Sequence, residues 1–333
     1  MPLLFLGGVE EVIMQIRKGT ESDIPAIVEL LKSSLGEGLI QKSEQLWKWK
    51  HVENPNGASP VLVAEADGKV VGVRAFLRWQ WVYKGKVLQA IRAVDTATHP
   101  DFQGKGIFKK LTLQGLDQAK LAGIDLVYNT PNESSKPGYL KMGWVEMSRM
   151  ALKLKVNPFA YKSSIPPAVP TKDWEKLKFV LPLFSNPIAS HELVHTLLSP
   201  AYIRWRYQDN PLFDYHFLSD YRSYVLFYRI KQHSFGQEMR VVDLLTIKGA
   251  FDKASKKGLA AEFKKISSNC FLTSASGRHF ELTENVYPGM GLLPVMAKGP
   301  IVTLRNISLD EEAFKELGKQ QNWGYSLGDM ELF

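Results

Sequence analysis

Cysteine is almost absent from this chain of 333 residues, in which Cys270 stands alone. A single cysteine excludes an internal disulfide framework of the kind that stabilises small secreted domains. Cys270 lies in the apolar stretch NCFL, where a small buried residue is expected rather than a nucleophile.

Long apolar runs are missing too. No uncharged apolar stretch approaches the roughly 18 residues that a membrane-spanning helix needs. The opening MPLLFLGGVEEVIM is apolar but short, carries no basic leader and reaches two glutamates before it could act as a signal peptide. We therefore expect a cytoplasmic protein with no membrane partner, and Met14 is a candidate start.

The chain has a positive balance but no basic tract. Its 42 basic and 34 acidic residues give a net charge of +8, which favours anionic partners. Because the basic residues are spread along the chain, a phosphorylated cofactor or a solvated surface fits as well as nucleic acid. The segments LWKWKH, RWQWVYK and YIRWRYQ mix aromatic and basic residues as single-strand-binding surfaces do, but half-buried strands have the same alternation, so nucleic acid is the less favoured partner.

The first half alternates strand and helix patterns. Thr20 and Asp23 have the spacing of a capping box, before apolar residues at helical spacing up to Leu31. Three strand patterns follow over 60–100, separated by turns at Asp67-Gly68 and Lys84-Gly85-Lys86. A helical pattern from 106 on, a buried strand, a short helix opened by Pro137 and a strand ending near Val156 complete the order. This order predicts an α/β (α+β mixed) fold with a mostly antiparallel sheet flanked by helices.

The second half repeats motifs of the first. WKHVENP (49–55) matches WRYQDNP (205–211), 156 residues later. Arg92, Val94 and Asp95 match Arg240, Val242 and Asp243 at an offset of 148, and the same offset carries Tyr139, Met142 and Gly143 onto Tyr287, Met290 and Gly291. We infer an internal duplication. The expected organisation is an extension (1–13), a first domain (14–156), a proline-rich linker (157–172) and a second domain (173–333).

One glycine-rich loop separates a strand from a helix. In QGKG (103–106), the glycines would let backbone N–H groups close on a pyrophosphate at the positive end of the helix dipole, with Lys105 adding charge. No lysine followed by Ser or Thr completes a P-loop, and the third glycine of a dinucleotide fingerprint is missing. A tight turn is the alternative interpretation of this loop taken alone.

Two motifs together resemble the GNAT (GCN5-related) N-acetyltransferases. THPDFQGKGI is similar to the acetyl-CoA motif of that family. NESSKPGYLKMGW is similar to its second signature, in which Asn132, Tyr139, Gly143 and Trp144 fill the expected places. The resemblance covers 15–156 well and the second half as a degenerate copy, which makes the chain similar to a tandem GNAT protein. Phe108 departs from the family, which has Gly or Ala there. It lies on the apolar stripe of the helix, so its ring can point into the core.

The resemblance implies an acetyl-CoA-dependent transferase that acts on a primary amine of a small molecule, amino sugar or peptide. It implies that backbone groups near Ala97 and Thr98 bind the pantetheine arm, and that Tyr139 protonates the leaving thiolate. Asp95 and the carboxylate of Phe333 are the candidate bases. The residues expected to bind the cofactor are Ala97, Thr98, Gln103, Gly104, Lys105, Gly106, Ile107, Phe108 and Asn132. The sequence leaves the acceptor, the acyl chain length and the oligomeric state open.

The second half provides a comparison for this loop. Residues 251–256 occupy the place of 103–108 and contain no glycine, and Asp252 would repel a pyrophosphate. We therefore expect one acyl-CoA per chain, with the second half shaping the acceptor pocket or supporting the first domain. An inactive GNAT-like scaffold or regulator is the alternative that the sequence leaves open.

A zinc-protease motif also occurs in the second half. HELVH (191–195) has the H-E-x-x-H spacing that places two histidines on one face of a helix. Apolar residues around Val194 permit a helix, but Pro200 would end it soon and the extended continuation of the motif is missing. We expect no metal site.

Overall fold

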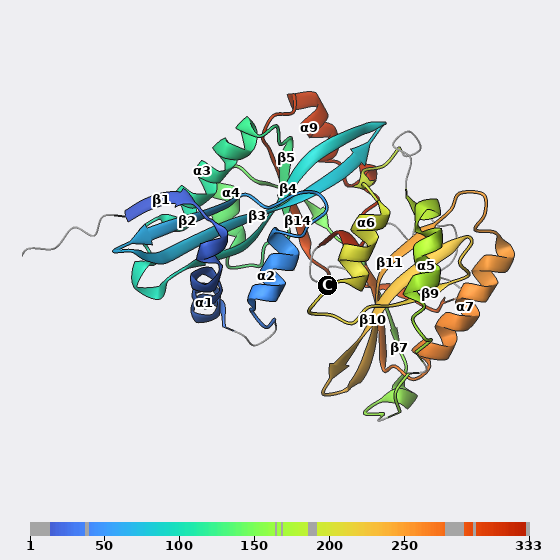
Figure 1. Cartoon of the computed structure of the whole chain (residues 1–333). Helices are drawn as coiled ribbons and strands as arrows, with labels where there is room; N and C mark the ends of the chain where they lie inside the picture. Colours follow the sequence, from blue (N-terminus) through green and yellow to red (C-terminus); the bar gives the residue numbers. More distant parts are fainter. Residues whose placement is uncertain are drawn as a thin grey trace, which may run out of the picture.

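The structure is a computed structural model that describes residues 14–36, 40–163, 165–167, 169–185, 192–276, 290–295 and 298–330. Two β-sheets, each flanked by helices, form two lobes (Figure 1). The N-terminal extension expected at 1–13 lies outside the described residues. No described helix is both long and apolar enough to cross a lipid bilayer.

The first sheet is mixed, with a single parallel pair among its described strands. Its order is β1-β2-β3-β4-β5-β14-β6, with β8 paired to β3, and only β4 and β5 run parallel. The strands are β1 (Met14–Lys18), β2 (Val61–Ala66), β3 (Lys69–Tyr83), β4 (Lys86–Thr98), β5 (Leu126–Asn129), β6 (Val145–Arg149), β8 (His195–Thr196) and β14 (Ile301–Asn306).

Helices cover both faces of this sheet because alternate strand residues point to opposite sides. Ala75 and Leu77 of β3 pack in one core with α1 (Ile24–Leu35) and α2 (Glu44–His51). Phe76, between them, packs in a second core with α3 (Ile107–Leu121) and α4 (Lys136–Lys141). The capping box at Thr20 and the positive φ angles at Asp67-Gly68 and Lys84-Gly85 confirm the turns expected from the sequence.

The second sheet has the order β13-β7-β12-β11-β10-β9. Only β11 and β12 are parallel among its described pairs, the same relation as β4 and β5. Its strands are β7 (Leu152–Val156), β9 (His216–Ser219), β10 (Tyr224–His233), β11 (Gly236–Thr246), β12 (Leu272–Ser276) and β13 (Leu293–Val295). The described helices in the second half of the chain are α5 (Trp174–Val180), α6 (Pro200–Ile203), which continues into a π-helical turn over Arg204–Gln208, α7 (Lys253–Ser267) and α9 (Glu311–Leu317). Of these, α9 lies beside β5 and β14 of the first sheet (Figure 1).

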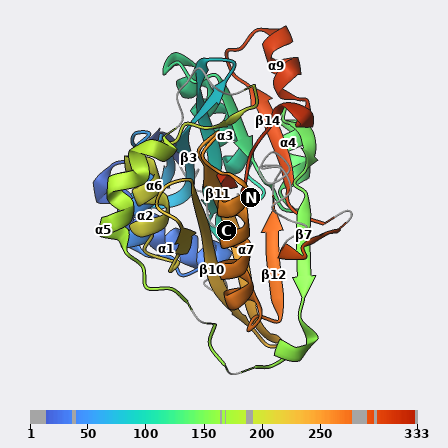
Figure 2. The same cartoon turned by 90° about the vertical axis from the view of Figure 1, so that its right-hand side faces the viewer.

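The halves exchange strands. The strand expected near Val156 is present as β7, but it pairs antiparallel with β12 in the second sheet, as Figure 2 shows. In return, β14 from the end of the chain lies between β5 and β6 of the first sheet. A strand pattern in sequence does not specify a partner, because every strand offers the same backbone groups. The domain ranges 14–156 and 173–333 stay a prediction.

The HELVH segment is not a helix where the structure describes it. His195 belongs to β8 and pairs with Val82 of β3, and His191 lies outside the described residues. The expectation of a helix here was wrong, because pairing with the edge of β3 outweighs the apolar spacing around Val194. Among the described residues, no three His, Cys, Asp or Glu side chains are grouped to hold a metal ion.

Candidate acyl-CoA site

A cavity of about 970 Å³ opens where β4 and β5 separate. Pairing between these parallel strands ends at Arg92 and Tyr128, while β4 continues to Thr98. The edge of β4 from Ala93 to Thr98 therefore borders the cavity with backbone groups that β5 does not use. An elongated ligand can insert between the strands and bond to this edge as a missing strand would.

The glycine loop forms the mouth of the cavity at the N-terminus of α3. Gly104 and Gly106 both have left-handed backbones, with φ of +75° and +74°, and no atom lies within 4 Å of where a Cβ would be. Gly106 is the N-cap of α3 and has no side chain to occupy the free N–H groups of the first turn. These groups and the helix dipole favour an anion at this position.

Most of the residues expected to bind the cofactor line this one cavity. Lys105 does not; its ammonium lies over the ring of Phe102, 4.7 Å from the centroid. The cavity-lining members of the expected set are Ala97, Thr98, Gln103, Gly104, Gly106, Ile107, Phe108 and Asn132. Their individual roles stay predictions.

Phe108 packs between the cavity and the helix–sheet core. Its ring meets that of Tyr139 edge-on at 5.6 Å, and the side chain packs against the core formed by α3 and α4. The aromatic residue that departs from the family pattern therefore faces inward from the first turn of α3, while Gly104 and Gly106 stay open. The Phe108 side chain therefore does not occupy the space beside Gly104 and Gly106.

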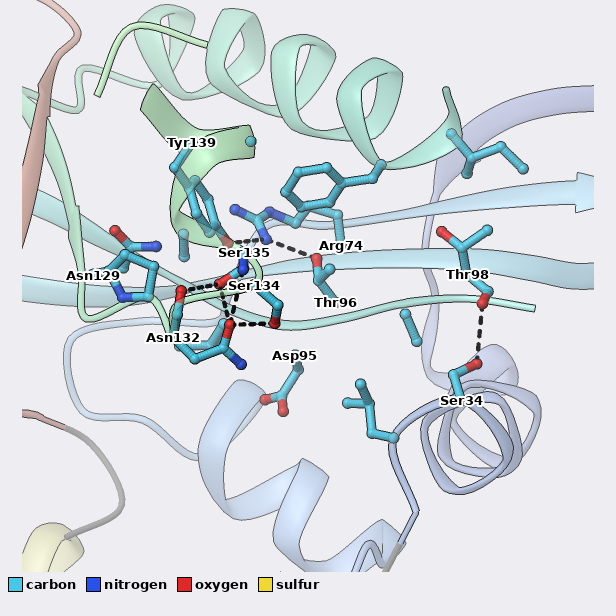
Figure 3. Close-up of a pocket in the computed structure, with 18 of the residues that line it drawn as sticks. Ser34, Arg74, Asp95, Thr96, Thr98, Asn129, Asn132, Ser134, Ser135 and Tyr139 are labelled. Atoms are coloured by element: carbon cyan, nitrogen blue, oxygen red, sulfur yellow. Dashed lines mark hydrogen bonds between the residues drawn. The ribbon is translucent and has the colours of Figure 1, made fainter. Parts of the chain in front are cut away.

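Tyr139 is held at the inner end of the cavity by a buried arginine. Arg74 of β3 donates from Nη1 to the Tyr139 hydroxyl at 2.8 Å and to Oγ1 of Thr96 at 2.7 Å, as Figure 3 shows. Thr96 faces Arg74 directly across the β3–β4 ladder. Tyr139 itself is 5% exposed, and it is one of the residues that line the cavity.

Asp95 is the extra residue of a β-bulge in β4. The register with β3 passes from Thr96 to Val94 without it, and its φ of 38° is in the left-handed region. The bulge turns the carboxylate toward α2, where Oδ2 lies 2.5 Å from Nζ of Lys50 and 2.8 Å from Nε2 of His51. Burial alone would raise the pKa of Asp95, but the charge of Lys50 and the hydrogen bond from His51 outweigh it and hold the pKa well below its usual range.

This pairing matters for proton transfer. A carboxylate whose pKa is strongly lowered accepts a proton poorly near neutral pH. Asp95 is also the one carboxylate among the described residues that line the cavity. The geometry thus favours Asp95 as the counterion of Lys50.

Asn132 begins the turn that leads into α4. Its Oδ1 accepts hydrogen bonds from the Ser135 amide at 2.9 Å and from the hydroxyls of Ser134 and Ser135, both at 2.8 Å. The residue lines the cavity, but this oxygen already holds the loop that positions Tyr139. A structural role accounts for its presence as well as ligand contact does.

The end of the chain reaches the same cavity. Thr196 donates to Oδ1 of Asp329 at 2.5 Å, and Met330 lines the cavity with its sulfur 3.6 Å from Nη1 of Arg92. Phe333, a candidate base, lies outside the described residues, as does Tyr287.

Arg74 and Lys50 were missed in the sequence. Arg74 is a lone cation within the apolar run VVGVRAFL, and a charge among core residues of a strand was the available signal. Lys50 gave no such signal, because lysines are common on helices and its burial depends on the bulge at Asp95.

The matching helix of the second half is closed to an anion. Asp252 is the N-cap of α7, and its side chain accepts from the Ser255 amide at 2.8 Å. A carboxylate thus already occupies the position that stays open at Gly106. This agrees with the expectation of one acyl-CoA per chain, which remains a prediction.

Comparison with known proteins points to one family for the first half. The model of the acetyltransferase (GNAT) domain matches residues 15–147. The L-amino acid N-acyltransferase MnaT of Escherichia coli K12 is 25% identical over 152 residues, which are 41% of this chain and 83% of the relative.

Solved structures share the fold of most of the chain. A GCN5-related N-acetyltransferase from Anabaena variabilis has a TM-score of 0.59 at 13% identity, covering 89% of this chain and 73% of its own. N-myristoyltransferase of Saccharomyces cerevisiae with bound myristoyl-CoA has a TM-score of 0.55 at 10% identity, covering 91% and 83%. At these identities the likeness is one of fold.

Proposed function

Residues 15–147 match the model of the acetyltransferase (GNAT) domain, and from that match we propose that the chain is an acyltransferase. In this proposal it transfers the acetyl group of acetyl-CoA to a primary amine of a small molecule, amino sugar or peptide. One observation supports the donor site most: the open glycine loop, the free edge of β4 and Tyr139 border the same cavity.

The donor would lie between β4 and β5. Its pyrophosphate would meet the N–H groups after Gly104 and Gly106, and its pantetheine arm would bond to the backbone of Ala97 and Thr98. One of these N–H groups would polarise the thioester carbonyl and stabilise the negative charge that forms there. Tyr139 would then be next to the sulfur.

The reaction is direct transfer in this proposal. The amine nitrogen forms a bond to the thioester carbon, the C–S bond breaks, and the electron pair leaves with sulfur. Tyr139 supplies a proton to that thiolate. The proton lost by the amine goes to a base, for which the carboxylate of Phe333 is the better candidate, since Lys50 and His51 already neutralise Asp95.

Free amino acids are the first acceptors to test. The residues that line the cavity include Lys42 and Arg92, and their positive charge suits an acceptor that carries a carboxylate near its amine. The name of the curated relative, an L-amino acid N-acyltransferase, agrees with this choice.

The test is an acetyl-CoA consumption assay against a panel of amines. L-amino acids, amino sugars, polyamines and short peptides are compared, with release of free CoA thiol as the readout and mass spectrometry of the acetylated product as confirmation. We expect one acceptor class to exceed the rate of hydrolysis by at least tenfold. Failure of every class, although acetyl-CoA binds, would favour the inactive scaffold.

A further inference from the structure

Arg74 is a buried cation that no described carboxylate balances. The residue is 1% exposed, and its Nη1 bonds to Thr96 and Tyr139. Nε and Nη2 are buried and make no hydrogen bond to any described residue. Buried charges are costly unless they are paired, so a charge kept here needs a physical explanation.

Aromatic rings around Arg74 provide part of the explanation for its buried charge. The guanidinium carbon lies 4.7 Å from the ring centroid of Phe76, 5.3 Å from that of Tyr139 and 5.6 Å from that of Phe108. Such contacts stabilise a buried cation to a limited degree. They do not neutralise it, and of the two hydroxyls that accept from Arg74, the phenol of Tyr139 is the more acidic.

The direction of the Arg74–Tyr139 hydrogen bond is unambiguous. A guanidinium has donors only, so the Tyr139 oxygen must accept, and its own proton must point elsewhere. Because Tyr139 lines the cavity, that proton is available to a group bound there.

We propose that Arg74 is the positioning residue that makes Tyr139 an effective acid, by directing its proton into the cavity and stabilising the phenolate left after proton transfer. This rests on the proposed function. In the step, the C–S bond breaks, the thiolate takes the Tyr139 proton to become CoA thiol, and the phenolate remains 2.8 Å from Nη1 of Arg74. The proton released by the amine restores the phenol through the base or water.

Variants can distinguish a role of Arg74 in positioning Tyr139 from a purely structural role. Arg74→Gln removes the charge, Arg74→Lys keeps it, and Arg78→Gln changes an arginine of the same strand outside the cavity, which donates to the Ala58 carbonyl. The full chain is used throughout, with melting temperature and acetyl-CoA affinity measured for each variant.

We expect Arg74→Gln to lower kcat by roughly ten- to a hundredfold with acetyl-CoA affinity within about twofold, Arg74→Lys to recover part of the rate, and Arg78→Gln to match the wild type. Added to Tyr139→Phe, Arg74→Gln should cause no further loss.

Equal losses with and without Tyr139→Phe would overturn the proposal, as would loss of acetyl-CoA binding in both Arg74 variants. If wild type transfers acetyl and Arg74→Gln keeps the wild-type kcat, only the role of Arg74 fails. If wild type acetylates no amine although it binds acetyl-CoA, the proposed function itself fails.

Discussion

Trp49 and Trp205 exchange hydrogen bonds where the two halves meet. The indole N–H of Trp49 donates to the Trp205 carbonyl at 2.9 Å, and that of Trp205 donates to the Trp49 carbonyl at 2.8 Å. Their rings stack at 4.7 Å. These are the residues that the sequence repeat aligns, and a reciprocal contact between matched positions is what a local two-fold relation between two copies produces. The duplication remains a prediction that this contact supports.

Replacing either tryptophan should destabilise the protein through its hydrogen bond. Trp49→Phe or Trp205→Phe leaves a buried carbonyl without its donor, which costs about 1–3 kcal/mol in addition to lost packing. Trp81→Phe is the matched control, because Trp81 is fully buried and its indole N–H makes no hydrogen bond to any residue that the structure describes. Urea unfolding measures the free energies, and equal losses in all three variants would contradict the role of the exchanged hydrogen bonds.

Gly106→Glu should abolish acyl-CoA binding. The substitution places a carboxylate at the helix N-terminus where the pyrophosphate would lie, and a β-carbon where the backbone is left-handed. Gly123→Glu is the control, since Gly123 follows the same helix, has φ of +71° and is equally open, so the backbone cost is shared. Calorimetric titration with CoA measures affinity; normal binding by Gly106→Glu would remove the loop from the site.

Tyr139→Phe should lower kcat without weakening the binding of acetyl-CoA. The ring that packs against Phe108 and Trp144 is kept, and only the acidic proton is lost, which typically costs a factor of about 10²–10⁴. Steady-state kinetics and calorimetry separate the two effects. Tyr161→Phe, at an exposed position, serves as control. A fall in affinity with unchanged kcat would assign Tyr139 to binding instead.

Extending the chain beyond Phe333 should lower kcat more than Asp95→Asn does. In the proposed mechanism, extra residues displace the terminal carboxylate that acts as base, whereas Asp95→Asn removes the charge that Lys50 and His51 contact and should act mainly on stability, by about 3–5 kcal/mol. Turnover is measured below the melting temperature of each variant. Full activity of the extended chain, with loss in a folded Asp95→Asn protein, would reverse the assignment of the base.

The contribution of Asp243 to the free energy of unfolding should fall as the pH rises from about 4 to above 6. Burial raises the pKa of Asp243 to about 6, against the lowering by its hydrogen bond from Tyr207. The native state binds this proton more tightly than the unfolded chain does. The resulting stabilisation is therefore complete below the ordinary pKa of 3.8 and disappears as the pH rises past about 6. The free energy of unfolding falls by about 3 kcal/mol in all.

Asp243→Asn isolates this effect. The variant should gain stability relative to wild type between pH 4.5 and pH 7.5, as measured by urea unfolding at both values. A constant difference across that range would show that Asp243 is ionised in the native protein throughout it. Asp95, the matched residue of the first half, has the opposite shift because it has Lys50 and His51 as partners.

The sequence by itself determined the local elements and the place of the site. Glycines before a helical pattern, turn residues between alternating strands, and the Asn132–Trp144 segment act over short stretches, where neighbours in sequence are neighbours in space. The mixed fold and the similarity of residues 15–147 to the GNAT domain could be predicted for this reason, whereas the roles of the residues around the glycine loop stay predictions.

Tertiary structure alone decided three things. β7 and β14 change sheets, because backbone groups pair with whichever edge the packing presents. Arg74 reaches Tyr139 across 65 residues, and Lys50 meets Asp95 only because a bulge turns that carboxylate toward α2. Each depends on contacts between distant segments, whose geometry follows from the packing of helices on sheets and is not encoded in the spacing of residues along the chain.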